Sequence, residues 1–243
     1  MIIAVLSDIH GNQAALKAVM NNILIQHPEV EAFVLLGDLI DYGPHSNEVI
    51  ELIKAIEIPI FCNIWGNHEQ AVMTGEYSRF SSARGVACAK HTSDILGESA
   101  RKYIDERMEH AGIQIFCIEE KKCMAVHGSL SDPYWKSITA DDAISGYENY
   151  DYIFSGHSHL PHYFEKYYKA DAPETRNRKK VIFINPGSVG QPRNINNKAQ
   201  YVILDTNTEN IQFVKVSYDI LLEQRNFTND VDEFYKERLE RGI

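Results

Sequence analysis

The chain has 243 residues, of which 44% are apolar and 24% are charged, a composition typical of a soluble globular protein. Its formal net charge of −10 disfavours non-specific binding to nucleic acids and to anionic membranes, so we expect neither as a partner. The apolar run at the N-terminus is too short for a signal peptide, and no stretch reaches the ~20 apolar residues of a membrane span, which favours a cytoplasmic location.

The first half of the chain alternates short apolar runs with amphipathic segments. Three runs rich in β-branched residues predict buried strands at residues 2–6, 32–36 and 58–62. Asn12 is a candidate cap for a helix that runs to about Gln26, and Ser46 is a candidate cap for a second helix. This strand–helix–strand order favours parallel strands.

The second half is richer in predicted strands, which lie at residues 113–117, 123–126, 152–154, 181–184, 201–204 and 211–214. Short connections between several of these strands indicate hairpins. The whole pattern predicts an α/β fold, a four-layer α-β-β-α sandwich of two mixed sheets flanked by helices. We expect a single domain over residues 1–243, with a mostly helical, cap-like insertion at about 71–110 and an exposed helix from about 218 to 241.

Polar side chains directly follow five of the predicted strands. They are Asp8 and His10, Asp38 and Asp41, Asn67 with His68 and Glu69, His127, and His157 with His159. Because ligands of open α/β sheets bind beyond the carboxyl ends of the strands, we expect these side chains to meet at one edge. Asp8 and His10 are two positions apart, as are His157 and His159. In extended backbone, side chains at this spacing point to the same side.

Seven of these side chains carry the ligand types of hard to borderline divalent ions, since carboxylates, an amide and imidazoles occur without thiolates. They are Asp8, His10, Asp38, Asn67, His127, His157 and His159. Seven ligands are too many for one ion, whereas two ions about 3.5–4 Å apart that share a carboxylate would use them all. We therefore expect two divalent transition-metal ions, with Mn first and Fe, Zn, Co or Ni as alternatives.

The ordered motifs resemble those of the calcineurin-like metallophosphoesterase superfamily. They are Asp8-x-His10, Gly37-Asp38-x-x-Asp41, Gly66-Asn67-His68-Glu69, His127 and Gly156-His157-x-His159, and the resemblance runs from residue 7 to about 193. It implies a first metal site of Asp8, His10, Asp38 and His159, and a second of Asp38, Asn67, His127 and His157. Asp38 would then bridge the two ions.

The resemblance also implies a reaction, the hydrolysis of a phosphodiester or phosphomonoester by in-line attack of a hydroxide held between the ions. His68 would protonate the leaving oxygen or stabilise charge near it. Asp41 and Glu69 correspond to groups that orient the ligands. Arg193 is a candidate cation for contact with the phosphate.

The sequence departs from one branch of the superfamily. Protein serine/threonine phosphatases carry arginines at the positions of Tyr42 and Trp65, so this activity is disfavoured. A small phosphorylated substrate fits better, either a phosphodiester or a dinucleotide polyphosphate such as diadenosine tetraphosphate. The latter is suggested because the segment GDLIDYGP resembles bacterial relatives described that way. A non-catalytic scaffold is the alternative from another class, although such relatives usually lack ligands that are present here.

Three features admit two interpretations each. Tyr134 and Trp135 would either stack on a nucleobase or pack under the insertion. The basic residues between 176 and 180 would form either a clamp for a polyanion or a solvated hairpin connection. The loop at 185–190 would be either part of the site or a structural turn.

Overall fold

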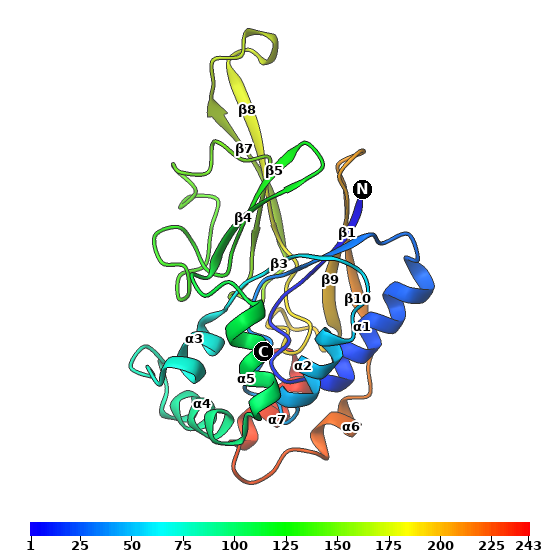
Figure 1. Cartoon of the computed structure of the whole chain (residues 1–243), viewed down its shortest axis with the longest axis vertical. Coiled ribbons are helices and arrows are strands. Elements are labelled where there is room, and N and C mark those ends of the chain that lie inside the picture. Colours follow the sequence, from blue (N-terminus) through cyan, green and yellow to red (C-terminus); the bar gives the residue numbers. More distant parts are fainter.

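Two mixed sheets of five strands each form the centre of the molecule (Figure 1). In spatial order, the first sheet contains β10 (Asn210–Val216), β9 (Ala199–Asp205), β1 (Ile2–Leu6), β2 (Ala32–Leu35) and β3 (Ile60–Asn63). The second contains β4 (Ile113–Ile118), β5 (Lys121–Val126), β6 (Tyr152–Ser155), β8 (Arg178–Asn185) and β7 (His162–Lys169). The computed structural model describes residues 1–243 throughout.

Seven α-helices and one short 3-10 helix, Pro173–Thr175, accompany the sheets. The helices are α1 (Gln13–Gln26), α2 (Ser46–Lys54), α3 (Asn67–Thr74), α4 (Ala83–Ile95), α5 (Glu98–Arg107), α6 (Ile220–Gln224) and α7 (Glu233–Arg241). Figure 1 shows them in the lower half of the view and beside β10, while the β7–β8 hairpin projects at the opposite end. No helix combines the length and the apolar character that a membrane span requires.

The two sheets pack face to face around a core of 16 buried residues, to which Val5 and Val34 of the first sheet and Phe154 of the second contribute. Because side chains alternate along a strand, Leu6 and Leu35 point the other way and pack under the helices. Strands buried on both faces carry continuous apolar runs, which is why the sequence revealed them. The predicted α/β fold with two mixed sheets is confirmed.

The outer face of the second sheet is covered by the irregular connection between β5 and β6. Ile138, Tyr147 and Tyr150 of this connection pack on Ile153 and Phe183 of the sheet. The remaining outer layer, over the first sheet, consists of helices and holds the largest core cluster, of 26 residues.

Three local predictions about this framework were incomplete or wrong. Strand β7 was not predicted, because its residues alternate between half-buried and exposed and include several charged side chains. The C-terminal segment is not one exposed helix, since it forms α6 and α7, and Tyr235 and Leu239 of α7 are each 3% exposed. Asn12 caps α1 as predicted, but the Ser46 hydroxyl accepts from the Asp41 backbone N–H instead of capping α2.

Candidate metal centre

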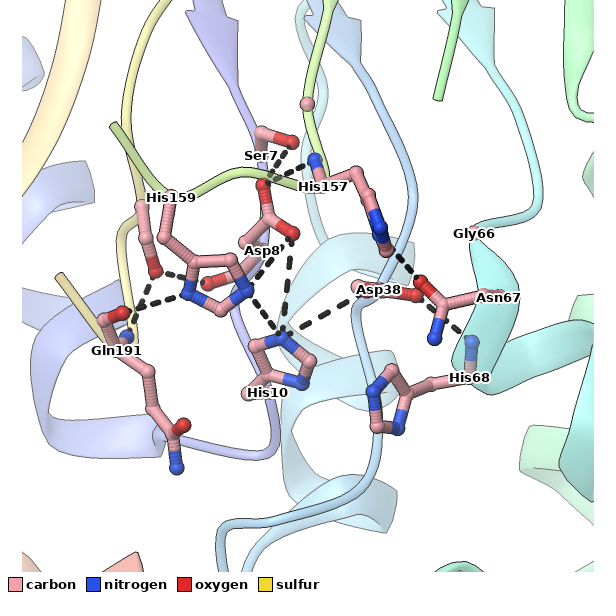
Figure 2. Close-up of polar contacts among 12 residues, drawn as sticks. Ser7, Asp8, His10, Asp38, Gly66, Asn67, His68, His157, His159 and Gln191 are labelled. Carbon is pink, nitrogen blue, oxygen red and sulfur yellow. Dashed lines mark hydrogen bonds and ion pairs between the residues drawn. The ribbon is translucent and has the colours of Figure 1, made fainter. Parts of the chain in front are cut away.

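The candidate ligands gather at the carboxyl ends of parallel strands from both sheets. β1, β2 and β3 run parallel in the first sheet, and β5, β6 and β8 run parallel in the second. The segments that follow these strands meet at the edge where the two sheets adjoin, and Figure 2 shows their side chains converging. The edge therefore has the position at which α/β sheets bind their ligands.

Backbone at this edge adopts the left-handed conformation at five candidate ligands. The φ angles are 54° at Asp8, 49° at His10, 53° at Asp38, 64° at His157 and 57° at His159. Extended backbone was the expected explanation for the i, i+2 spacing, and it is wrong, because left-handed turns direct these side chains inward. Such a residue costs on the order of 1–3 kcal/mol and persists where the surrounding structure enforces it, as at functional sites.

The first cluster consists of Asp8, His10, Asp38 and His159, whose potential ligand atoms all lie within 4.8 Å of one another. His159 Nδ1 lies 2.6 Å from the Gln191 carbonyl oxygen, and it must donate a proton there. The Nε2 atom of His159 therefore carries a lone pair, yet it lies 3.2 Å from Asp8 Oδ1. His159 Nε2 and Asp8 Oδ1 are therefore two acceptors in contact with no donor between them, an arrangement that a cation bound by both would stabilise.

The second cluster, Asp38 with His127 and His157, follows the same logic. His127 Nδ1 donates to the Leu36 carbonyl oxygen at 2.6 Å, so the neutral ring carries a lone pair on Nε2. Burial lowers the pKa of His127, but the charge of Asp38 raises it to about 9, so a metal ion here would take the place of a proton. This Nε2 atom lies 3.2 Å from Asp38 Oδ2 and 3.1 Å from Asn67 Oδ1, both oxygens that accept rather than donate. The second cluster is therefore also suited to a bound cation.

One carboxylate oxygen belongs to both clusters. Asp38 Oδ2 lies 3.2 Å from His127 Nε2 and 3.7 Å from His10 Nε2. The other oxygen of the same carboxylate, Oδ1, accepts a hydrogen bond of 2.9 Å from the His68 backbone N–H. The carboxylate is thus held in one orientation, with a single oxygen facing both centres.

Burial prepares the two imidazoles of the first cluster for metal binding. Burial and the charge of His68 hold the pKa of His10 well below its usual value. Burial and the charge of Arg193 do the same for the pKa of His159. Both rings are therefore neutral at neutral pH, which is the form that binds metal ions. Arg193, a predicted phosphate contact, consequently lies close to the first cluster.

His68 does not belong to either cluster and forms a pair with Asp41. The His68 Nδ1 atom lies 2.6 Å from Asp41 Oδ2, and the ring is 3% exposed. Burial alone would lower the pKa of His68, but the charges of Asp38 and Asp41 raise it overall. Thr92, in the predicted insertion, donates to Asp41 Oδ1 at 2.7 Å, and Phe80 lies 5.2 Å from the His68 ring. Residues 71–110 thus contact the candidate site.

Glu69 is fully buried and connects the start of α3 with the loop that presents Asp38. Its carboxylate accepts from the backbone N–H groups of Asp38 at 2.8 Å, Leu39 at 2.7 Å, Ile40 at 3.2 Å and Gly66 at 2.8 Å. A Cβ atom at Gly66 would overlap Asp38 Oδ1, so only glycine fits beside this loop. Glu69 therefore fixes the position of Asp38 without contacting the clusters' ligand atoms.

Replacing Glu69 with Ala is expected to lower the free energy of unfolding by at least ~3 kcal/mol, because several buried N–H groups would lose their acceptor at ~1–3 kcal/mol each. Urea denaturation of the purified variant measures this change. Glu106→Ala, at an exposed position of α5, is the control and should stay within about 0.5 kcal/mol of the unchanged chain. A Glu69→Ala variant as stable as this control would contradict the assigned role.

Sequence reasoning missed two residues that position the first cluster. The Ser7 hydroxyl donates to Asp8 Oδ2 at 2.6 Å, and Gln191 supplies the carbonyl oxygen for His159. The loop at 185–190 also contacts the cluster, since the Ser188 hydroxyl donates to the Asp8 carbonyl oxygen at 2.7 Å. One available signal was that residues 185–191 follow β8, another parallel strand, as the other motifs follow theirs.

Comparisons with known proteins agree with this geometry. A family model described as "Calcineurin-like phosphoesterase superfamily domain" matches residues 1–209. The uncharacterized protein MJ0912 of Methanocaldococcus jannaschii is 32% identical over 99% of this chain and 98% of its own length. Among solved structures, a metallophosphoesterase from Sphaerobacter thermophilus is 25% identical, with a TM-score of 0.74 and full coverage of both chains. Hypothetical protein PH1004 from Pyrococcus horikoshii is 24% identical, with a TM-score of 0.76 over 100% of this chain and 98% of its own.

Proposed function

Because this chain belongs to the calcineurin-like phosphoesterase superfamily, we propose that it hydrolyses a phosphodiester or a phosphomonoester with two divalent transition-metal ions. Asp8, His10, Asp38 and His159 would hold one ion, and Asp38, Asn67, His127 and His157 the other. Manganese is the first candidate, because oxygen and imidazole ligands are combined without thiolates. The observation that carries the proposal is the single Asp38 oxygen that faces both clusters.

The donor set fits such ions, since the neutral rings of His127 and His159 would each direct a lone pair at oxygens that cannot donate. Bound ions would neutralise phosphate oxygens and lower the pKa of a water molecule, which makes it a nucleophile. The protein's own contribution is to fix the ligands through Ser7, Glu69 and the Gln191 carbonyl. His68, oriented by Asp41, would deliver a proton to the leaving oxygen.

Hydrolysis of bis-p-nitrophenyl phosphate and p-nitrophenyl phosphate tests the proposal directly. The chain, loaded with Mn²⁺ and freed of excess metal, is expected to release p-nitrophenol from at least one of the two. Treatment with a chelator should abolish release, and added Mn²⁺ should restore it. Folded chain that binds two ions and turns over neither substrate would refute the proposed hydrolysis.

A dinucleotide polyphosphate is the second candidate substrate, and aromatic residues beside the centre favour it. Trp135 is half-buried, and its ring centroid lies 6.3 Å from that of His157 and 5.1 Å from that of Phe80. Arg79 lies over the Trp135 ring at 5.4 Å. A base could stack on such a surface. Comparing kcat/KM for diadenosine tetraphosphate with that for bis-p-nitrophenyl phosphate decides between the two candidates.

A non-catalytic scaffold of the same fold is the competing proposal. It is disfavoured because the complete set of candidate ligands converges and the His68–Asp41 pair is intact. Metal analysis of the purified chain separates the two proposals at once, since a scaffold with no metal function should retain fewer than one ion per chain after dialysis.

A further inference from the structure

Two arginines near the metal centre, Arg193 and Arg238, lack an Asp or Glu partner. Arg193 follows Gln191, whose carbonyl oxygen binds His159, by two residues, and Arg238 lies in α7. No Asp or Glu side chain lies within ion-pair distance of either arginine, although the chain carries ten more acidic than basic residues. Arg238 is 8% exposed, and its only hydrogen-bond partner is an oxygen of Ile243, the last residue, so most of its donors are unused. Such a group is a candidate for binding an anion.

Helix α7 brings Arg238 to the centre through a stack of aromatic rings. Tyr235 stacks on Tyr42, with ring centroids 4.3 Å apart and planes inclined by 19°. Tyr42 in turn lies 4.7 Å from the ring of His10 and 4.3 Å from that of His68. Arg238 follows Tyr235 by three residues and therefore lies on the same face of the helix. One layer of aromatic side chains separates α7 from the candidate ligands.

The charge of Arg193 reaches both the first cluster and Arg238. Its charge acts on His159 on one side, and on Arg238 on the other, where burial together with Arg193 lowers the pKa of the guanidinium to about 10. The Nε atom of Arg193 is buried and has no hydrogen-bond partner. The Nε atom of Arg238 donates to an oxygen of Ile243, and the two terminal nitrogens of Arg238 have no hydrogen-bond partner.

Gln191 supplies the uncharged donor of the group. It is 2% exposed, and neither its side-chain nitrogen nor its side-chain oxygen has a partner. Figure 2 shows its side chain directed away from His159, toward the level of the His10 and His68 rings. Leaving a buried amide without partners costs about 1–3 kcal/mol, so this amide indicates a ligand.

We propose that Gln191, Arg193 and Arg238 form a second anion subsite, which receives a phosphate group of the substrate other than the one attacked. The inference rests on the proposed hydrolysis, and it narrows the substrate to a molecule with at least two phosphate groups. Guanidinium groups suit this role because they form charge-assisted, paired hydrogen bonds with phosphate oxygens. Part of the subsite comes from α7, which lies beyond residues 1–209 of the family match.

The test compares inorganic phosphate with pyrophosphate as ligands of the Mn²⁺-loaded chain. Titration calorimetry gives the dissociation constant of each, and inhibition of bis-p-nitrophenyl phosphate hydrolysis gives an independent value. Pyrophosphate is expected to bind the unchanged chain at least about tenfold more tightly than phosphate, the gain of one charge-assisted hydrogen bond. Arg238 lies over the Phe234 ring at 5.0 Å, and Arg238→Met keeps a long apolar side chain there. In this variant the preference for pyrophosphate should fall to about threefold or less.

Arg241→Met is the matched control, because Arg241 is exposed on the same helix and pairs only with Glu237. It should keep the preference for pyrophosphate. If Arg238→Met prefers pyrophosphate over phosphate as strongly as the unchanged chain does, the subsite is overturned. The subsite is also overturned if the variant binds both ligands more weakly by the same factor, because a uniform loss indicates a structural role. The calorimetric arm does not depend on turnover, so an inactive chain that shows the Arg238-dependent preference would refute the hydrolysis and retain the subsite.

Discussion

Asp38→Asn is expected to remove metal from both clusters at once. An amide has one oxygen, and at this position either choice of orientation fails. If the oxygen keeps the hydrogen bond from the His68 N–H, the amide nitrogen, which has no lone pair to offer, faces both clusters. If the amide is reversed, its NH₂ group faces the backbone N–H of His68, so two hydrogen-bond donors meet without an acceptor. Asn tolerates the left-handed backbone at this residue, so the fold should survive.

The variant is measured by metal content per chain after dialysis and by hydrolysis of bis-p-nitrophenyl phosphate. We expect fewer than one ion per chain and a loss of rate greater than the roughly 10–100-fold caused by removing a group that only orients a ligand. Asp41→Asn is the matched control, as it is equally buried and also left-handed but belongs to neither cluster. It should keep both ions. An Asp38→Asn variant that retains two ions would refute the bridging role.

His68→Ala should leave metal content unchanged and slow hydrolysis to a degree that depends on the leaving group. A general acid contributes about 10²–10⁴-fold when the leaving oxygen is basic. For p-nitrophenolate, which is stable without a proton, the loss should be much smaller. The reason lies in the geometry, because His68 contacts Asp41 rather than the metal clusters and is left free to transfer a proton.

Rates for p-nitrophenyl, phenyl and methyl esters of one phosphate therefore separate proton transfer from positioning. The ratio of the hydrolysis rate of the unchanged chain to that of His68→Ala should rise steadily from the p-nitrophenyl to the methyl ester. His91→Ala, a half-buried histidine of α4 outside the clusters, is the control and should match the unchanged chain for every ester. A constant loss across the series would assign His68 to substrate binding instead of acid catalysis.

The strands and the convergence of the motifs could be predicted because both follow from local patterns. Buried parallel strands carry unbroken apolar runs, as in Val5 and Val34, and each run ends where a motif begins. The packing of two sheets then brings His127 and His157, from the second sheet, to the ligands that follow β1 and β2. The family resemblance added the division of the ligands between two metal sites and the role expected of His68.

The contacts that lie far apart in sequence could not be predicted. Nothing near Tyr235 indicates that it stacks on Tyr42, nearly two hundred residues earlier, because an amphipathic helix does not specify which surface it covers. Gln191 holds His159 through its backbone oxygen, so for this contact the residue type carries no signal. The left-handed turns at Asp8 and His10 were also missed, since these residues occur more often in ordinary conformations.

The left-handed backbone of the candidate ligands limits how the site can change in evolution. Asp, Asn and His are the residues that tolerate this conformation best after glycine, and they are also suitable metal ligands. A single exchange such as Asp8→Asn would therefore alter the chemistry while the turn remained intact, whereas a β-branched residue at the same position would strain the turn itself. Activity can thus be lost or retuned one ligand at a time on an unchanged scaffold, so folded relatives without the reaction should arise readily from this architecture.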